Sequence, residues 1–156
     1  VPVVAAGGIG SARAMAAALA AGADAVRVGT RFVAASESLA HPYYKEALIR
    51  AAPEDTVLTE AYSVTWPNAP HRVLRSAIIA AQGLGDGVIG ETQIGGNRLA
   101  LPRFSTPAPL VTTTGKIEAM ALYAGESVGA VKRIQPAAEI VRELAEGAEQ
   151  LLQRWR

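Results

Sequence analysis

The hydrophobic pattern near the start of the chain predicts a strand, a helix and a second strand. An uninterrupted apolar run over residues 2–6 ends in Gly7-Gly8, and a second, β-branched run covers residues 24–29. Between them, apolar residues recur at helical spacing after Ser11, a residue type suited to capping a helix. Short uninterrupted apolar runs suit parallel strands that are buried on both faces. The spacing therefore predicts a βαβ crossover with two neighbouring parallel strands.

Farther along the chain, the pattern predicts fewer strands and more helices and loops. The predicted elements are a brief helical turn from Thr30, a helix that begins near Pro42, a strand over residues 56–60, and amphipathic helices over residues 71–82 and 136–155. We predict no regular structure for the glycine-rich residues 83–96 or for residues 98–115, which are rich in Pro and Thr.

Both predicted parallel strands run straight into glycine, at Gly7-Gly8 and at Gly29-Thr30. A strand that stops in glycine and leads into a helix presents backbone N–H groups at the positive end of that helix, which favours a phosphate. The carboxyl ends of parallel neighbours lie on one edge, so both turns can converge on one phosphate group. A single glycine after a strand is as readily explained by a tight turn. Two such turns at a βα interval, the second with a hydroxyl, favour phosphate binding.

The composition narrows the classes of partner and site. The chain has 15 Lys and Arg and 14 Asp and Glu, scattered along its length, so no charge imbalance favours nucleic acid or an anionic membrane surface. It has no Cys, and its two His lie far apart without clustered carboxylates, so we predict no disulfide, Cys nucleophile or metal site. No apolar run approaches the ~20 residues of a membrane span. We expect a soluble, cytoplasmic protein that binds neither nucleic acid nor membranes.

The opening block carries a resemblance to a known family. Residues 1–32, VPVVAAGGIGSARAMAAALAAGADAVRVGTRF, resemble the flavin-binding carboxyl-terminal half of the nitronate monooxygenases, also known as 2-nitropropane dioxygenases. Other flavin barrels have similar glycine turns, but the resemblance continues through SESLAHPYYKEALI, TWPNAPHRVLRS, ALYAGESVGAV and PAAEIVREL. It covers nearly the whole chain, least clearly over residues 83–114.

The resemblance implies an α/β fold, and within that class the last two βα units of a (β/α)8 TIM barrel followed by a carboxyl-terminal helical or irregular segment. We expect one domain over residues 1–156, in which residues 1–35 form the phosphate-binding βαβ unit and residues 36–156 form a helical extension and substrate-side loops. A complete barrel needs eight strands and about 250 residues. This chain has no initiator Met and opens on a strand. We therefore expect a partial barrel that associates with a missing amino-terminal half or with itself.

The resemblance also implies an activity: FMN-dependent oxidation of alkyl nitronates with O2 to a carbonyl compound and nitrite. The FMN-phosphate contacts of the family fall on Gly7, Gly8, Gly29 and Thr30, with Val28 reaching the ligand through its backbone. The YAGES block resembles a segment of the family on the flavin and substrate side, so Tyr123, Glu126 and Ser127 are candidates for that side. Trp66, in a loop that contains prolines, could equally line a substrate pocket or plug the rim of the barrel. Many members of the family have Gln where this chain has Glu126. The catalytic base of the family is a His in a segment that precedes the opening strand, so we assign no catalytic residue within this chain.

Two other functions remain open. The chain could serve a flavin-dependent NAD(P)H oxidoreductase that reduces enoyl-acyl-carrier-protein thioesters or quinones, or it could be a non-catalytic flavin-binding fragment. We interpret His41, which precedes a Pro, and His71, at the start of a predicted helix, as capping or packing residues. Arg27 lies inside an apolar strand, where an unpaired charge is costly to bury, so we expect it to reach the ligand edge or a carboxylate.

Overall fold

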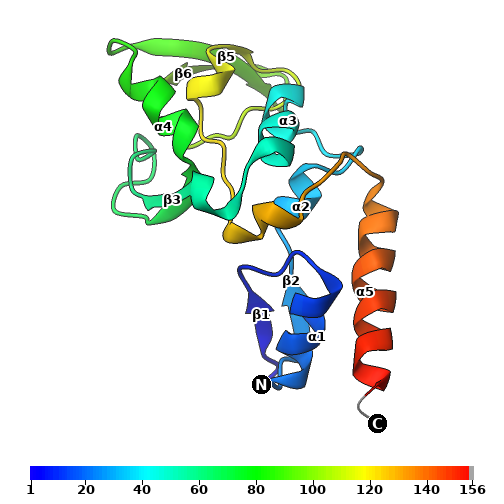
Figure 1. The fold of residues 1–156 in the computed structure, drawn as a ribbon. Coiled ribbons are helices and arrows are strands. Elements are labelled where there is room, and N and C mark those ends of the chain that lie inside the picture. The colour runs from blue at the N-terminus through cyan, green and yellow to red at the C-terminus, as the bar shows by residue number, and fades with distance from the viewer. Residues whose placement is uncertain (155–156) are drawn as a thin grey trace.

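The structure is a computed structural model, and it describes residues 1–154 (Figure 1). The strands are β1 (Val4–Ala6), β2 (Ala25–Arg27), β3 (Thr56–Thr59), β4 (His71–Leu74), β5 (Val88–Ile94), β6 (Asn97–Pro102) and β7 (Thr114–Gly115). The α-helices are α1 (Ala12–Ala20), α2 (Thr30–Val33), α3 (Pro42–Arg50), α4 (Arg75–Gln82) and α5 (Ala137–Gln153). Short 3-10 helices are η1 (Pro53–Asp55), η2 (Ile117–Ala119) and η3 (Glu126–Ala130). The chain thus mixes helices and strands, as the α/β prediction requires.

The opening strand, helix and strand form the predicted βαβ unit. β1 and β2 pair in parallel, and Ala6 lies opposite Arg27. The Ser11 side chain accepts a hydrogen bond from the Ala14 N–H at 3.2 Å and so caps α1. The parallel crossover is confirmed, and it places the carboxyl ends of β1 and β2 side by side.

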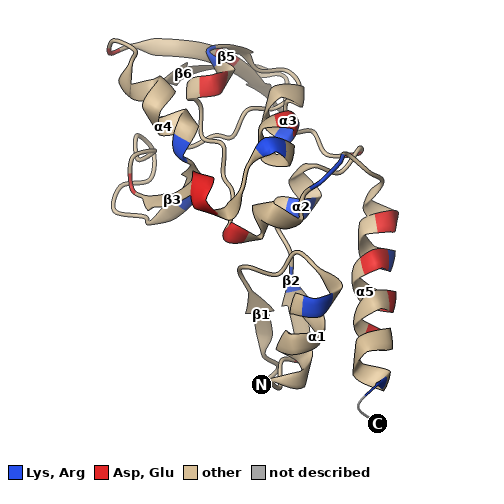
Figure 2. Cartoon of the chain, in the orientation of Figure 1, with Lys and Arg blue, Asp and Glu red and all other residues tan. Residues whose placement is uncertain are grey.

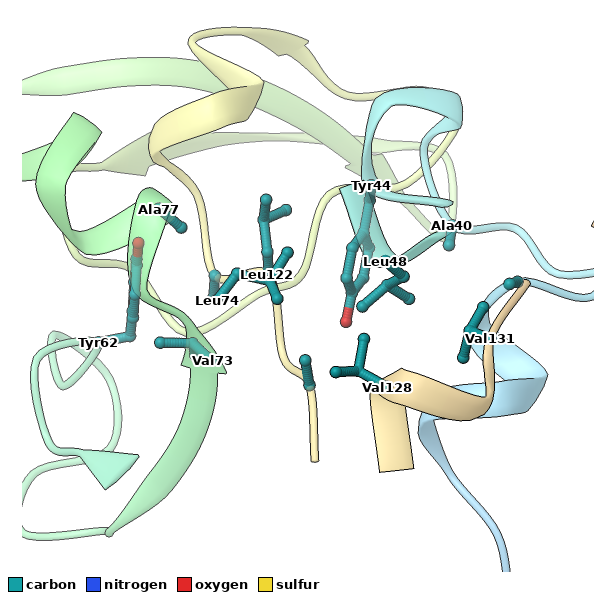
Figure 3. Close-up of a cluster of buried hydrophobic side chains, with 13 residues drawn as sticks. Ala40, Tyr44, Leu48, Tyr62, Val73, Leu74, Ala77, Leu122, Val128 and Val131 are labelled. Atoms are coloured by element: carbon teal, nitrogen blue, oxygen red, sulfur yellow. The ribbon is translucent and has the colours of Figure 1, made fainter. Parts of the chain in front are cut away.

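Residues between positions 34 and 131 pack around a separate hydrophobic core (Figure 3). Tyr44 and Leu48 of α3, Val73 of β4, Ala77 of α4 and Leu122 are each at most 2% exposed and belong to one cluster. β3 pairs with β4 in antiparallel fashion, and β5 pairs likewise with β6 and β7. Figure 1 shows the βαβ unit at one end of the molecule, with α5 beside it.

The last helix joins the βαβ unit to the rest of the chain. Ile140 and Leu144 of α5 are 1% and 4% exposed and form a second apolar cluster with Ala35, against which Val28 packs. The long helix predicted for this segment is confirmed as far as Gln153, whereas Trp155, its predicted last residue, lies outside the described residues. α5 therefore buries one apolar face against the chain that follows β2.

A glycine allows α5 to lie close to α1. A Cβ atom added at Gly147 of α5 would lie 2.6 Å from the Cβ atom of Ala12. Two Cβ atoms at this distance would overlap, because non-bonded carbon atoms make their most favourable contact at about 3.5–4.0 Å. The absence of a side chain at Gly147 therefore sets the distance between the two helices.

Glu143 of α5 is the centre of a polar network (Figure 2 shows the acidic residues along this helix). Its carboxylate forms an ion pair with Arg31, lies 3.0 Å from an Arg133 nitrogen and accepts a hydrogen bond from the Gln135 side chain at 3.1 Å. Burial alone would raise the pKa of Glu143, but the hydrogen bonds from Gln135 and Arg31, together with the charges of Arg31 and Arg133, outweigh burial and lower it.

Glu37 caps the N-terminus of α5. Its carboxylate accepts hydrogen bonds from the Ala137 N–H at 3.0 and 3.2 Å, at the first residue of α5. This backbone hydrogen bond holds the pKa of Glu37 below its ordinary value of 4.5, because it stabilises the charged form. A negative charge at a helix N-terminus is also favoured by the helix dipole.

The structure corrects the prediction of a helix over residues 71–82. His71–Leu74 form β4, antiparallel to β3, and α4 begins only at Arg75. Val73 is fully buried, and the Leu74 N–H donates to the Leu122 carbonyl at 2.9 Å. These long-range pairings outweigh the local helical spacing of apolar residues.

The glycine-rich segment forms a hairpin, although no regular structure is predicted for it. Ile94 of β5 pairs with Asn97 of β6 across a loop made of Gly95 and Gly96, whose φ angles are 57° and 82°. Glycine reaches these left-handed angles without steric cost, and a Gly-Gly dipeptide is a common hairpin connection. Most side chains of β5 and β6 are exposed, so the hydrophobic pattern carries little signal for these strands.

We expect Gly147→Ala to lower the free energy of unfolding by about 1–3 kcal/mol, because the added methyl would meet Ala12. Helix propensity alone would give the opposite sign, by about 1 kcal/mol. Urea unfolding measures the change. Ala12→Gly removes the opposing methyl, so the double variant should lose less stability than the sum of the single changes. A more stable Gly147→Ala variant would contradict the close contact of α1 and α5.

We expect stability to fall in acid through Glu37 and Glu143. Both carboxyls have a pKa below the ordinary value of 4.5 in the folded state, so their contribution is fully present above that value and is lost as pH falls through the lower, folded-state values. Thermal unfolding measured below pH 4.5 should therefore depend less on pH in Glu143→Gln than in the unchanged protein. Glu146→Gln, in an exposed ion pair on α5, is the control and should keep the original profile. Equal profiles for all three proteins would contradict the role of Glu143.

Candidate functional site

The two predicted glycine turns meet at one edge of the β1–β2 pair. Gly7 and Gly8 follow β1, and Gly29 and Thr30 follow β2. Both turns line a single cavity of about 260 Å³. Because β1 and β2 are parallel neighbours, their carboxyl ends open on the same side, where ligands of open α/β sheets bind. The structure therefore brings these four residues together.

Gly7 and Gly8 of the first turn line the cavity and have open space where a side chain would begin. Gly7 and Gly8 have φ angles of 93° and 68°, which side chains rarely allow, and a Cβ atom added to either would meet no other atom within 4 Å. A ligand can therefore approach the backbone of this turn without meeting a side chain. This is the geometry in which N–H groups of a turn bind an anion.

A third segment, distant in sequence, completes the cavity wall. The Gly125 N–H donates to the Thr30 hydroxyl oxygen at 2.9 Å, and Gly125 and Ser127 line the cavity beside the two turns. A Cβ atom at Gly10 would lie 3.0 Å from the Ser127 Cβ, so η3 packs directly on the first turn. The Thr30 oxygen accepts this bond, and its own hydrogen stays available for donation to a ligand.

The other residues expected at the site lie in different surroundings. Glu126 is 3.2 Å from the Arg72 guanidinium, and Tyr123 donates its hydroxyl to the Thr106 carbonyl at 2.8 Å. Trp66 is 63% exposed in the loop between β3 and β4. The Val28 side chain packs against the apolar cluster of α5, and Val28 is not among the residues that line the 260 Å³ cavity. Among the substrate-side candidates, Ser127 thus lines the cavity with the glycine turns.

Arg31 holds the walls of the cavity in place. Its guanidinium donates to the Gly10 carbonyl at 2.9 Å and also pairs with Glu143 of α5. The side chain of Arg31 is only 13% exposed, so this ion pair is partly shielded from water. It links the first turn, the start of α2 and the last helix. Sequence spacing does not reveal this role, because Gly10 and Glu143 are brought to Arg31 by tertiary packing.

A second, more open cavity lies next to the first. It has a volume of about 570 Å³ and shares Gly8 and Ser127 with the first cavity. Arg50, Glu126 and Lys132 add charges of both signs to its lining. The Gly8–Ser11 loop therefore has accessible space on two sides.

Both His side chains have structural roles, as expected. His41 accepts a hydrogen bond from the Tyr43 N–H at 3.1 Å and caps α3. His71 makes a 2.8 Å hydrogen bond through Nδ1 to the Ala69 carbonyl, while its Nε2 accepts from the Tyr62 N–H at 3.4 Å. Neither ring faces the 260 Å³ cavity. These contacts leave both imidazoles engaged with the backbone of their own loops.

Residues 1–154 contain neither a cluster of metal ligands nor a helix suited to crossing a membrane. In this part of the chain, no three His, Cys, Asp or Glu side chains come together in a way that could hold a metal ion. Nor does any helix described here combine the length and the apolar character needed to cross a bilayer.

Comparison with known proteins agrees with the resemblance. The chain is 36% identical to a nitronate monooxygenase of Paraburkholderia phytofirmans, in a match that covers 97% of this chain and 40% of that protein. An octahydroindene-carboxyl-CoA dehydrogenase of Mycobacterium tuberculosis is 39% identical over 79 residues, which are 51% of this chain and 21% of that protein. The chain thus spans less than half the length of these relatives.

A solved structure with a similar fold and a family model also match the chain. The nitroalkane oxidase of Streptomyces ansochromogenes superposes with a TM-score of 0.68 at 29% identity, over 100% of this chain and 41% of the other. The family model described as nitronate monooxygenase matches residues 1–147. The chain therefore belongs to the nitronate monooxygenase family, a family of enzymes.

Proposed function

We propose that the protein carrying this chain oxidises alkyl nitronates with O2 to a carbonyl compound and nitrite, and that this chain binds the phosphate end of FMN. The observation that carries the proposal is the convergence of both glycine turns and the Gly125–Ser127 segment on one cavity of about 260 Å³. Membership of the nitronate monooxygenase family supports the reaction.

The residues around the cavity fit a phosphate monoester. Gly7 and Gly8 leave their backbone open to a ligand, and Thr30 and Ser127, whose hydroxyls are hydrogen-bond donors, line the same cavity. N–H and O–H donors arranged around a small concave space are the usual means by which a turn binds phosphate. FMN, when bound, supplies the redox chemistry between nitronate and O2.

The role of this chain is then binding and orientation. Gly8, Gly29 and Thr30 hold the phosphate, which fixes one end of the cofactor, and Arg31 keeps the Gly10 loop in position through its 2.9 Å hydrogen bond to the Gly10 carbonyl. His41 and His71 do not line the 260 Å³ cavity, so we assign the base of the reaction to neither of them. The proton of the substrate is handled by residues outside this chain.

Exposed apolar residues at the start of β1 support the barrel part of the proposal. Val3, just before β1, and Val4, its first residue, are 58% and 56% exposed, which is unusual for an apolar run next to a parallel neighbour. We assign β1 and β2 to the last two βα units of a TIM barrel, in which further strands cover these side chains. In such a barrel the loops after the last two strands bind phosphate, in agreement with the cavity.

A second candidate function is a flavin-dependent NAD(P)H oxidoreductase that acts on enoyl thioesters or quinones. The similarity to a protein named as a carboxyl-CoA dehydrogenase favours it, because that name describes a redox reaction of a thioester. Both candidates use the same phosphate site, so they differ in the electron donor and not in the role of the glycine turns.

We expect Gly8→Val to weaken FMN binding at least about tenfold, because the side chain would fill the open approach and remove contacts between the phosphate and the backbone. Fluorescence titration with FMN measures the affinity. Gly22→Val is the matched control: Gly22 has a φ of 102° and open space around its Cβ position, but it lies in the turn between α1 and β2. The control should lose stability and keep its FMN affinity. Unchanged FMN affinity in Gly8→Val would contradict the phosphate site.

We expect the purified full-length protein, loaded with FMN, to release nitrite and a carbonyl compound when a short alkyl nitronate is added in air. Nitrite is measured colorimetrically, and NADH is added without air in a parallel experiment. The main proposal predicts nitrite release and little bleaching of the flavin by NADH. Rapid bleaching by NADH with no nitrite from several nitronates would favour the second candidate instead.

A further inference from the structure

Arg27 is the last residue of β2, and its side chain lies on the face of the strand that the helices leave uncovered. Side chains alternate along a strand. Val26 is half-buried and Val28 packs in the cluster under α5, whereas Ala25 and Arg27 are exposed on the other face. From there Arg27 lines the 260 Å³ cavity together with Gly8 and Thr30.

Arg27 gives this cavity its charge. It is the one charged residue in the lining, which otherwise consists of glycines, small apolar residues and the two hydroxyl residues Thr30 and Ser127. Within residues 1–154, the ion pairs of the structure engage seven other arginines with carboxylates, and Arg27 takes part in none of them. Arg27 therefore lines a space that has hydroxyl and glycine residues and no acidic side chain.

We propose that Arg27 is the charged ligand of the phosphate site and determines its selectivity for a flavin that carries a phosphate. The guanidinium binds the phosphate of FMN beside the second glycine turn, and riboflavin, which has no phosphate, gains nothing from it. A planar guanidinium can donate two parallel hydrogen bonds to phosphate oxygens, which are stronger than those of neutral donors. The proposal rests on the proposed function, because it takes FMN as the ligand.

The test compares FMN with riboflavin in the purified full-length protein. Fluorescence titrations give both affinities for the unchanged protein, Arg27→Gln, Arg27→Lys and the control Arg142→Gln, which removes an exposed arginine of α5. We expect Arg27→Gln to lower FMN affinity about tenfold to a hundredfold, as for loss of a charged hydrogen bond. Riboflavin affinity should stay unchanged, so the preference for FMN should fall by the same factor.

Two further readouts make the test specific. The FMN affinity of Arg27→Gln should depend less on salt than that of the unchanged protein, because one charge contact with the phosphate is gone. Arg27→Lys keeps the charge and loses the paired geometry, so its FMN affinity should lie between those of the other two proteins. Arg142→Gln should behave as the unchanged protein. Circular dichroism checks that each variant is folded.

Several results would overturn the proposal. If Arg27→Gln weakens FMN and riboflavin equally, then Arg27 contacts the flavin ring and not the phosphate. If neither the FMN affinity nor the riboflavin affinity changes, then Arg27 contacts neither the phosphate nor the ring. If the unchanged protein binds no FMN, the proposed function fails separately, and 31P NMR with inorganic phosphate then decides the role of Arg27. Phosphate binding that is lost in Arg27→Gln would support it, and binding that is absent from the unchanged protein or retained in the variant would overturn it.

Discussion

The parallel pairing of β1 with β2 is the contact on which the rest of the site depends. With Ala6 opposite Arg27, the chain leaves both strands at the same edge, and the turns Gly7-Gly8 and Gly29-Thr30 face one cavity. A shift of β2 by one residue would turn Val28 away from α5 and Arg27 toward it, because side chains alternate along a strand. The apolar cluster under α5 therefore also secures the placement of the turns.

The site is made of backbone and short side chains, so its shape depends on segments that are distant in sequence. Thr30 is tied to Gly125, and Arg31 joins the Gly10 carbonyl to Glu143 of the last helix. These contacts use ordinary hydrogen bonds and a partly shielded ion pair, each of modest strength in isolation. Together they hold the Gly10 loop, the start of α2 and the Gly125 segment around the 260 Å³ cavity.

Sequence reasoning identified the parts of the site that local chemistry determines. The two glycine turns and the Ser11 cap follow from residue type and spacing, and the structure has the strand, helix and strand that these predict. It did not identify β4, where tertiary pairing of Val73 outweighs helical spacing, or the β5–β6 hairpin, whose strands are mostly exposed. Nor could spacing reveal that Ser127 lies beside Gly8, because that contact depends on how η3 packs against Gly10.

A crystal structure of the full-length protein with FMN tests the central claim most directly, since that claim concerns the position of one phosphate group. The account predicts that phosphate oxygens lie within hydrogen-bond distance of backbone N–H groups from both turns, one at Gly7 or Gly8 and one at Gly29 or Thr30. An FMN phosphate bound elsewhere, with the 260 Å³ cavity filled by protein or water, would contradict it.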